Sequence, residues 1–170
     1  MSRLEEIRDF LALTERIGTA GQPLPEQFTA VREAGYEGVI NLIPPMVPAG
    51  FWPGEPEAVA ALGMEFVNIP VEWQAPTSQD LMRFFEVMAE RGEQRLFIHC
   101  VANKRVSVFL FLYRVLCLGM EEADAEDDLD RIWTPAGVWR AFLEEALTTG
   151  RAELMAHVRN RGGYGYSEQE

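Results

Sequence analysis

Within residues 96–115, LFIHCVANKRVSVFLFLYRV, a cysteine is followed closely by two basic side chains. His99 and Cys100 end a short apolar run, Lys104 and Arg105 come next, and an apolar helical pattern begins directly after them. The first amide groups of a helix have no intrahelical partner, and the helix dipole favours an anion at that end. Both effects stabilise a thiolate, which is the reactive form of cysteine. The spacing therefore predicts that Cys100 is a nucleophile on a strand-to-helix turn.

Apolar runs separated by helical patterns predict the elements that position this turn. Parallel strands need crossover connections, so the alternation predicts an α/β fold with a central, mostly parallel sheet flanked by helices. Ligands of such sheets gather outside the carboxyl ends of the strands, where Cys100 would lie. The predicted strands are residues 38–43, 65–71 and 95–100, with a short strand and turn in 17–23, and the predicted connecting helices lie in 24–35 and 77–92.

The C-terminal half is predicted to be helical and to cover the sheet, with helical patterns at 106–118, 123–133 and 137–147. A single domain is predicted over residues 1–160, and the glycine-rich, polar residues 161–170 are predicted to form a flexible tail. Residues 44–56 hold five prolines and two bulky aromatic residues, which predicts a structured or lid-like loop whose role the sequence leaves open.

The charge of the chain limits its partners. A formal net charge of −12 opposes binding to nucleic acid and to an anionic membrane surface. The longest apolar run is too short to span a membrane, and the first residues, MSRLEEIRDF, lack the apolar core of a signal peptide. A cytoplasmic location is therefore expected, in which the two cysteines serve packing or reactivity rather than cross-linking.

Metal ligands are sparse in the sequence. There are two histidines and no cluster of cysteine and histidine, so neither a metal site nor a cofactor is predicted. The acidic residues 121–130 are predicted to form the solvated face of a helix, with Ala123, Leu129 and Ile132 turned inward. A calcium loop would need regularly alternating oxygen ligands and a turn glycine, which this segment lacks.

The segment HCVANKRVS resembles the phosphate-binding signature of the cysteine-dependent phosphatases, in which His-Cys is followed by five residues, an arginine and a serine or threonine. Asn103 stands where that signature has a glycine, and asparagine tolerates the left-handed backbone better than other residues with a side chain. Ser107 matches the hydroxyl position. Val106 occupies the arginine position and Arg105 comes one residue early, a rotation of about 100° on a helix. Arg105 is therefore not expected to reach a phosphate by the usual path unless the loop repacks.

The resemblance covers roughly residues 17 to 118, including IGTAGQPLPEQFTAVREAGYEGVINLIPP and NIPVEWQAPT. These segments are similar to the bacterial phosphatase-like domains that also occur fused to beta-lactamase-like hydrolases. The resemblance implies a phosphatase of the dual-specificity or tyrosine type that acts on a phosphorylated protein or small molecule through a phosphocysteine.

The resemblance also assigns roles to individual residues. In the family an aspartate upstream of the cysteine donates a proton to the leaving oxygen, and Glu72 is the only carboxylate in the corresponding segment NIPVEWQAPT. The catalytic residues implied are Cys100, Arg105, Glu72 and Ser107, the last helping to release the thiolate. The substrate-binding residues implied are Val101, Ala102, Asn103, Lys104, Val106 and His99, which orients the loop backbone.

Several alternatives remain open from the sequence. The protein is alternatively a catalytically impaired pseudophosphatase that binds a phosphorylated ligand, or an enzyme that carries a persulfide or sulfenate on Cys100. Cys100 and His99 are alternatively packed core residues, and Glu72 an exposed residue at a strand end. Cys117 shares a helical face with Leu110 and Tyr113, which predicts core packing. Substrate, pathway and oligomeric state are not determined by the sequence.

Overall fold

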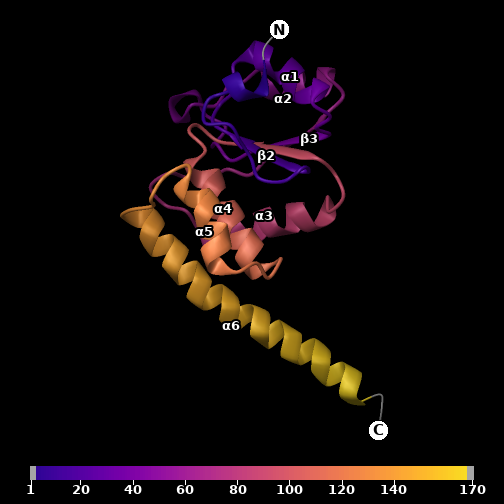
Figure 1. The fold of residues 1–170 in the computed structure, drawn as a ribbon, viewed down its shortest axis with the longest axis vertical. Coiled ribbons are helices and arrows are strands. Elements are labelled where there is room, and N and C mark those ends of the chain that lie inside the picture. The colour runs from indigo at the N-terminus through magenta and orange to yellow at the C-terminus, as the bar shows by residue number, and fades with distance from the viewer. Residues whose placement is uncertain (1–2, 168–170) are drawn as a thin grey trace.

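The computed structural model describes residues 3–167, with side chains described for residues 3–152, and its centre is a five-stranded sheet (Figure 1). The strands lie in the order β1-β2-β5-β3-β4, and β1 is antiparallel to β2 whereas the other neighbours are parallel. This arrangement confirms the predicted α/β fold with a mostly parallel sheet. The strands are β1 (Leu11–Ala12), β2 (Ile17–Ala20), β3 (Gly38–Asn41), β4 (Glu65–Asn68) and β5 (Leu96–His99).

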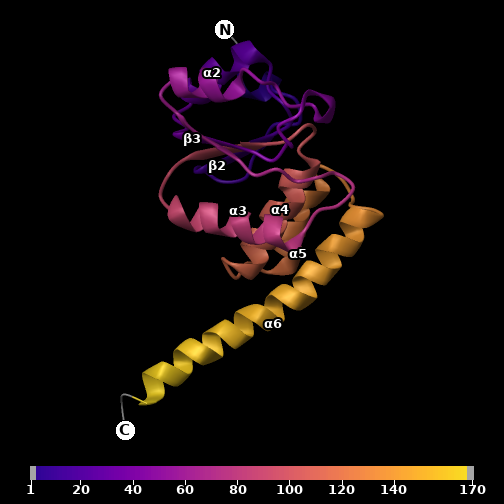
Figure 2. The same ribbon diagram turned by 180° about the vertical axis from the view of Figure 1, so that it is seen from behind.

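Helices cover both faces of the sheet, with α1 and α2 on one face and α3, α4 and α5 on the other (Figures 1 and 2). The beginning of the last helix, α6, packs against α4, and the rest of α6 extends beyond the body of the molecule. The α-helices are α1 (Phe28–Glu33), α2 (Glu55–Ala61), α3 (Ser78–Glu90), α4 (Lys104–Leu116), α5 (Glu122–Asp130) and α6 (Val138–Ser167). Short 3-10 helices form at Leu4–Glu6, Pro25–Gln27 and Val47–Ala49.

The alternation of side chains along the strands divides the core into two layers. Val39 and Phe97 point to the face covered by α1 and α2, whereas their neighbours Ile40 and Ile98 point to the face covered by α3 and α4. All four side chains are buried. Burial on both faces explains why β3 and β5 are continuous apolar runs and were predictable as strands.

The ends of the predicted helices follow from local signals. The Thr77 hydroxyl accepts a hydrogen bond from the Asp80 amide, and the Asp80 carboxylate accepts one from the Thr77 amide, each at 3.1 Å, so Thr77 caps α3. Gly35, at φ +94°, takes the left-handed conformation just after α1. Helix α2 was not predicted, because the prolines that indicate a loop over 44–56 extend into its first turn, where proline is tolerated.

Two predictions about the C-terminal half, those for Cys117 and Ala123, need correction. Cys117 is exposed rather than packed in the core, because it is the residue that caps the C-terminal end of α4, where the helix stops at Leu116. In α5 Leu129 is buried as predicted, and the buried alanine is Ala125 and not Ala123, which is exposed. Helix α6 continues through residue 167, so 161–167 are helical, and residues 168–170 of the predicted tail lie outside the described residues. None of the helices in the described residues combines the length and apolar character that crossing a bilayer needs.

Candidate active site

Cys100 lies immediately after β5, at the carboxyl edge of the sheet, and is 1% exposed. The residues that follow it, together with Cys100, form the Cys100 loop (residues 100–105), which passes into α4 at Lys104. Asn103 takes the left-handed conformation, φ 62°, in which asparagine is favoured among residues with a side chain. Its side-chain amide donates to the Thr19 hydroxyl and to the Asp9 carbonyl, both at 2.9 Å, so the turn is anchored to the neighbouring strand.

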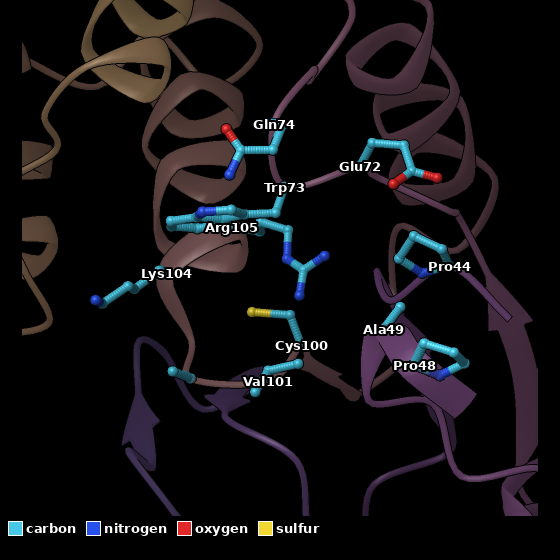
Figure 3. A pocket seen from close by; sticks show the side chains of 11 residues that line it. Pro44, Pro48, Ala49, Glu72, Trp73, Gln74, Cys100, Val101, Lys104 and Arg105 are labelled. Atoms are coloured by element: carbon cyan, nitrogen blue, oxygen red, sulfur yellow. The ribbon is translucent and has the colours of Figure 1, made fainter. Parts of the chain in front are cut away.

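A cavity of about 450 Å³ opens above the Cys100 loop (Figure 3). One wall comes from the proline-rich segment, which contributes Pro44, Pro48 and Ala49, and another from residues 72–74. The proline-rich loop, whose role the sequence left open, therefore forms part of the wall of this cavity. Of the residues that the sequence singled out, Cys100, Val101, Ala102, Lys104, Arg105 and Glu72 line this cavity.

The side chain of Arg105 lies in the cavity, in contrast to the expectation from its position in the sequence. Its guanidinium is directed toward the space above Cys100 (Figure 3), and its Nη1 donates to the carbonyl of Val71 at 2.8 Å. The Cys100 loop has four residues between cysteine and arginine, and α4 begins at Lys104, so Arg105 is in the first turn of the helix and faces the cavity. A shorter loop therefore brings Arg105 to the site without the repacking that the sequence comparison requires.

Val106 and Ser107 do not line the cavity. The side chain of Val106 is completely buried in the hydrophobic core, so a binding role for it is not supported by its placement. The Ser107 hydroxyl donates to the Lys104 carbonyl at 2.8 Å and accepts from the Trp133 indole at 3.0 Å. These bonds tie the first turn of α4 to the segment after α5.

Tryptophan side chains support the two basic residues of the cavity. The Arg105 Cζ lies 5.9 Å from the centre of the Trp73 ring, and the Lys104 Nζ lies 5.3 Å from that of Trp133. The Trp73 and Trp133 rings are 5.7 Å apart, and the indole of Trp139 donates to the Trp73 carbonyl at 2.8 Å. A cation over the face of an aromatic ring is attracted by the electron density of that face, so these contacts help to place both basic side chains.

Glu72 is the carboxylate of the cavity wall, on the segment that follows β4. It is exposed, and its carboxylate is turned toward Pro44 rather than toward the Cys100 sulfur (Figure 3). A role as proton donor therefore requires its side chain to change rotamer when a substrate is present. Although the chain is strongly acidic, Lys104 and Arg105 outnumber Glu72 among the charged residues of the cavity, which favours an anionic ligand.

His99 does not line the cavity, because it is completely buried beneath the Cys100 loop. Its Nδ1 lies 3.1 Å from the Cys100 carbonyl oxygen, and its Nε2 lies 2.6 Å from Oε2 of Glu55, which is also fully buried. Glu55 accepts further hydrogen bonds from the side chains of Gln22 and Asn41, at 2.9 and 3.0 Å. Burial alone would raise the pKa of Glu55, but the charge of His99 and these hydrogen bonds outweigh it, so the pKa lies below its ordinary value.

Glu55 was not predicted as a site residue. It lies in the proline-rich segment 44–56, which the sequence predicts to be a loop, and glutamate is mostly exposed in proteins, so nothing local marks it as buried. Asn41 was the available signal, because it is a polar residue in the otherwise apolar run GVINLI.

Two carbonyl groups of the Cys100 loop are held on the side away from the cavity. His99 contacts the Cys100 carbonyl, and the backbone N–H of Gln22 donates to the Val101 carbonyl at 3.0 Å. A trans peptide directs its amide opposite to its carbonyl, so the Val101 and Ala102 amides are directed toward the cavity. Gly21 permits this packing, because a Cβ at that position would meet the Val101 oxygen at 2.5 Å. Outward amides, a thiol and a guanidinium together form a site for a tetrahedral oxyanion.

Solved structures of one family share this fold and nearly a third of the aligned residues. The protein from Shewanella putrefaciens CN-32 named "Putative phosphatase (DUF442)" is represented by two crystal structures. The first is 30% identical to this chain, and the match covers 86% of this chain and 95% of that chain, with a TM-score of 0.76. The second is 32% identical, and the match covers 86% of this chain and 93% of that chain, with a TM-score of 0.73. The chain belongs to the DUF442 family. No family model matches the sequence.

Other relatives agree with the assignment of this DUF442 protein to the fold of the cysteine-dependent phosphatases. The Beta-lactamase hydrolase-like protein of Agrobacterium fabrum is 31% identical over 121 residues, which are 68% of this chain but 27% of that protein. The chain thus spans about a quarter of the length of this curated relative. The core catalytic domain of the PP-IP phosphatase Siw14 from S. cerevisiae, in complex with citrate, is 18% identical over 81% of this chain and 85% of that chain, with a TM-score of 0.68. The resemblance inferred from the sequence is therefore confirmed.

Proposed function

We propose that this DUF442 protein is a cysteine-dependent phosphatase that hydrolyses phosphomonoesters through a phosphocysteine on Cys100. The observation that carries the proposal is that Cys100 and Arg105 line one cavity, with the guanidinium directed toward the space above the cysteine (Figure 3). Membership of the DUF442 family supports a phosphatase function, and the cavity supplies the nucleophile and the cationic group that such chemistry needs.

In the first step the Cys100 thiolate attacks phosphorus and the ester P–O bond breaks. The negative charge on the non-bridging oxygens is stabilised by the amides of residues 101–106 and by Arg105, whose planar guanidinium matches two phosphate oxygens. The Nη1 bond to Val71 occupies one of the five N–H groups of Arg105 and leaves the others for substrate. The leaving oxygen takes a proton from Glu72.

In the second step water attacks the phosphorus of the phosphocysteine and the S–P bond breaks. Glu72, now a carboxylate, accepts a proton from that water, and inorganic phosphate and the Cys100 thiolate are released. Ser107 is assigned no chemical step, because its hydroxyl is bonded to Lys104 and Trp133. Its contribution is to hold the start of α4 and with it the side chain of Arg105.

The proposed substrates are phosphorylated proteins or small molecules. The cavity has mainly apolar and aromatic walls, from Pro44, Pro48, Ala49 and Trp73, which suit the organic part of a monoester. No cofactor or metal takes part in the proposed steps, and within the described residues no group of three or more His, Cys, Asp or Glu side chains is placed to hold a metal ion. A cytoplasmic setting is proposed because both cysteines are free, which a reducing compartment maintains.

Hydrolysis of an aryl phosphate, with and without EDTA, tests the proposal. We expect slow turnover by the wild type that EDTA does not change, and no turnover by Cys100→Ser. The variant is expected to retain binding of vanadate, a phosphate analogue, because the loop amides and Arg105 remain. Turnover that survives Cys100→Ser or disappears with EDTA would contradict the assignment of the nucleophile. Binding without wild-type turnover would instead identify the protein as a pseudophosphatase.

A further inference from the structure

Glu55 and His99 form a buried pair beneath the Cys100 loop that the proposed mechanism does not use. Both side chains are completely buried, with Nε2 and Oε2 2.6 Å apart, and Nδ1 of His99 lies 3.1 Å from the Cys100 carbonyl oxygen. A carbonyl oxygen only accepts hydrogen bonds, so Nδ1 must carry a proton to bond it. If Glu55 is ionised, it too only accepts, and Nε2 must also carry a proton.

The surroundings of Glu55 favour its ionised form. Oε1 accepts from Gln22, and Oε2 accepts from Asn41 as well as from His99. The orientation of the Asn41 amide is fixed, because its Oδ1 accepts from the Ile43 amide at 2.7 Å and only its NH₂ group can face Glu55. A buried carboxylate with three donors is stabilised in its charged form, in agreement with the lowered pKa of Glu55.

Among the described residues that contact the pair, none brings a competing charge. Glu55 comes from α2 and His99 from β5, Asn41 from β3 and Gln22 from the turn after β2, and the Phe28 ring of α1 packs edge-on against His99. Of these residues only Glu55 and His99 titrate. The protonation of His99 is therefore governed by Glu55 and by the Cys100 carbonyl.

We propose that Glu55 is a positioning residue of the active site, which keeps protons on both ring nitrogens of His99 so that a buried imidazolium holds the Cys100 carbonyl. This inference rests on the proposed function. The Nδ1–H bond fixes the peptide whose Val101 amide is directed toward the cavity. The imidazolium also places a positive charge beneath the cysteine, where it favours the thiolate over the thiol.

Protein labelled with ¹⁵N in its histidines tests the protonation directly, because imidazole nitrogens with and without a proton have distinct chemical shifts. The sequence has only two histidines, and a His157→Gln variant assigns the signals. We expect both ring nitrogens of wild-type His99 to be protonated at pH 7.5. In Glu55→Gln one of them is expected to lose its proton, because a buried imidazolium without a counter-charge is destabilised.

The consequence for Cys100 is measured by iodoacetamide alkylation against pH. Glu55→Gln keeps the shape of the side chain, so the loop is retained while the buried charge is lost. The variant loses both charges of the pair, but the imidazolium is the nearer to Cys100, because His99 contacts the Cys100 carbonyl and Glu55 contacts the far ring nitrogen. We expect the alkylation profile of Cys100 to move to higher pH, by up to roughly one unit. The aryl phosphatase pH profile should move in the same direction.

Asn68→Ala is the matched control. Asn68 donates to the carbonyls of Asn41 and Ile43, at 2.9 and 2.8 Å, on the same side of the sheet, but it has no hydrogen bond to Glu55 or His99. We expect this variant to be less stable than the wild type, with unchanged ¹⁵N shifts of His99 and an unchanged alkylation profile. A shift of the same size in Asn68→Ala would show that general destabilisation explains the effect and would overturn the proposal.

A neutral His99 in the wild type at pH 7.5 overturns the proposal, and so does an imidazolium that persists in Glu55→Gln. If Glu55→Gln does not fold, the wild-type histidine signals still decide, because loss of either ring proton below pH 8 contradicts a stable buried pair. The two proposals fail separately. A protein without phosphatase activity whose His99 signals and Cys100 alkylation behave as described would reject the proposed function and keep the role of Glu55.

Discussion

The guanidinium of Arg105 donates from Nη1 to the carbonyl oxygen of Val71 at 2.8 Å and so joins the first turn of α4 to the segment that carries Glu72. The Trp73 ring lies against the same guanidinium, 5.9 Å from its Cζ. Arg105 is 5% exposed, so these contacts fix it beneath the surface of the cavity. A guanidinium held in advance of substrate loses little freedom when it binds an oxyanion.

Replacement of Arg105 is expected to reduce catalysis strongly. Loss of a preorganised contact to the transition state typically costs about 2–4 kcal/mol, so kcat/KM of Arg105→Ala for an aryl phosphate should fall roughly 30- to 1000-fold. Arg140→Ala is the control, because Arg140 is exposed on α6 and pairs with Glu144. A fall of less than about threefold in Arg105→Ala would show that Arg105 has a structural role only.

Restoring an arginine at position 106 is expected to be harmful rather than beneficial. Val106 is 0% exposed in the core, so the new guanidinium would be buried without a partner. The cost is several kcal/mol, about as much as breaking a buried ion pair. We expect Val106→Arg to lower the melting temperature by about 10 °C or more, the size expected for such a loss of stability. We expect no gain in turnover. Val106→Leu is the control for size alone. Higher activity in Val106→Arg would mean that Arg105 does not serve the substrate.

The centre of the sheet was predictable because strands buried on both faces appear in the sequence as continuous apolar runs. The runs that became β3 and β5 carry this signal, whereas the edge strand β4 is only partly buried. The two-residue β1 is too short to give a period. Helix α2 is hidden by proline, which indicates a loop by frequency and yet is accepted in a first helical turn.

The candidate site was predictable only in part, because it depends on contacts between distant residues. Cys100 and the left-handed Asn103 follow from local sequence. The direction of Arg105 depends instead on where α4 begins, which a comparison of signature spacing does not give. The partner of His99 is 44 residues away in sequence, and only the packing of α2 on the sheet brings it into contact.

Cys117 provides an internal reference for the reactivity of Cys100. Partial burial raises the pKa of the Cys117 thiol, so less of it is thiolate at a given pH and its alkylation should be slow at pH 7, even though the residue is exposed at the surface. Peptide mass analysis after iodoacetamide treatment at pH 7 should find label mainly on Cys100. Cys117→Ser should leave the fast phase intact and Cys100→Ser should remove it. Equal rates at both positions would argue against an activated Cys100.

The buried carboxylate of Glu55 should make folding stability depend on acid. Its pKa in the folded protein lies below the ordinary value of 4.5, since the charge of His99 and three hydrogen bonds outweigh the effect of burial. A group with a lowered folded pKa contributes stability that is present above its unfolded pKa and is lost as the pH falls through its folded pKa.

The free energy of unfolding of the wild type, measured in urea, should therefore decrease below about pH 4.5 more steeply than that of Glu55→Gln, which has no carboxylate to protonate. At pH 5.5, above the ordinary pKa of Glu55, the variant should be less stable by on the order of 3–5 kcal/mol, as expected for a buried pair deprived of one partner. Parallel curves for the two proteins between pH 3 and 6 would show that Glu55 does not enter the folded state as a stabilised anion.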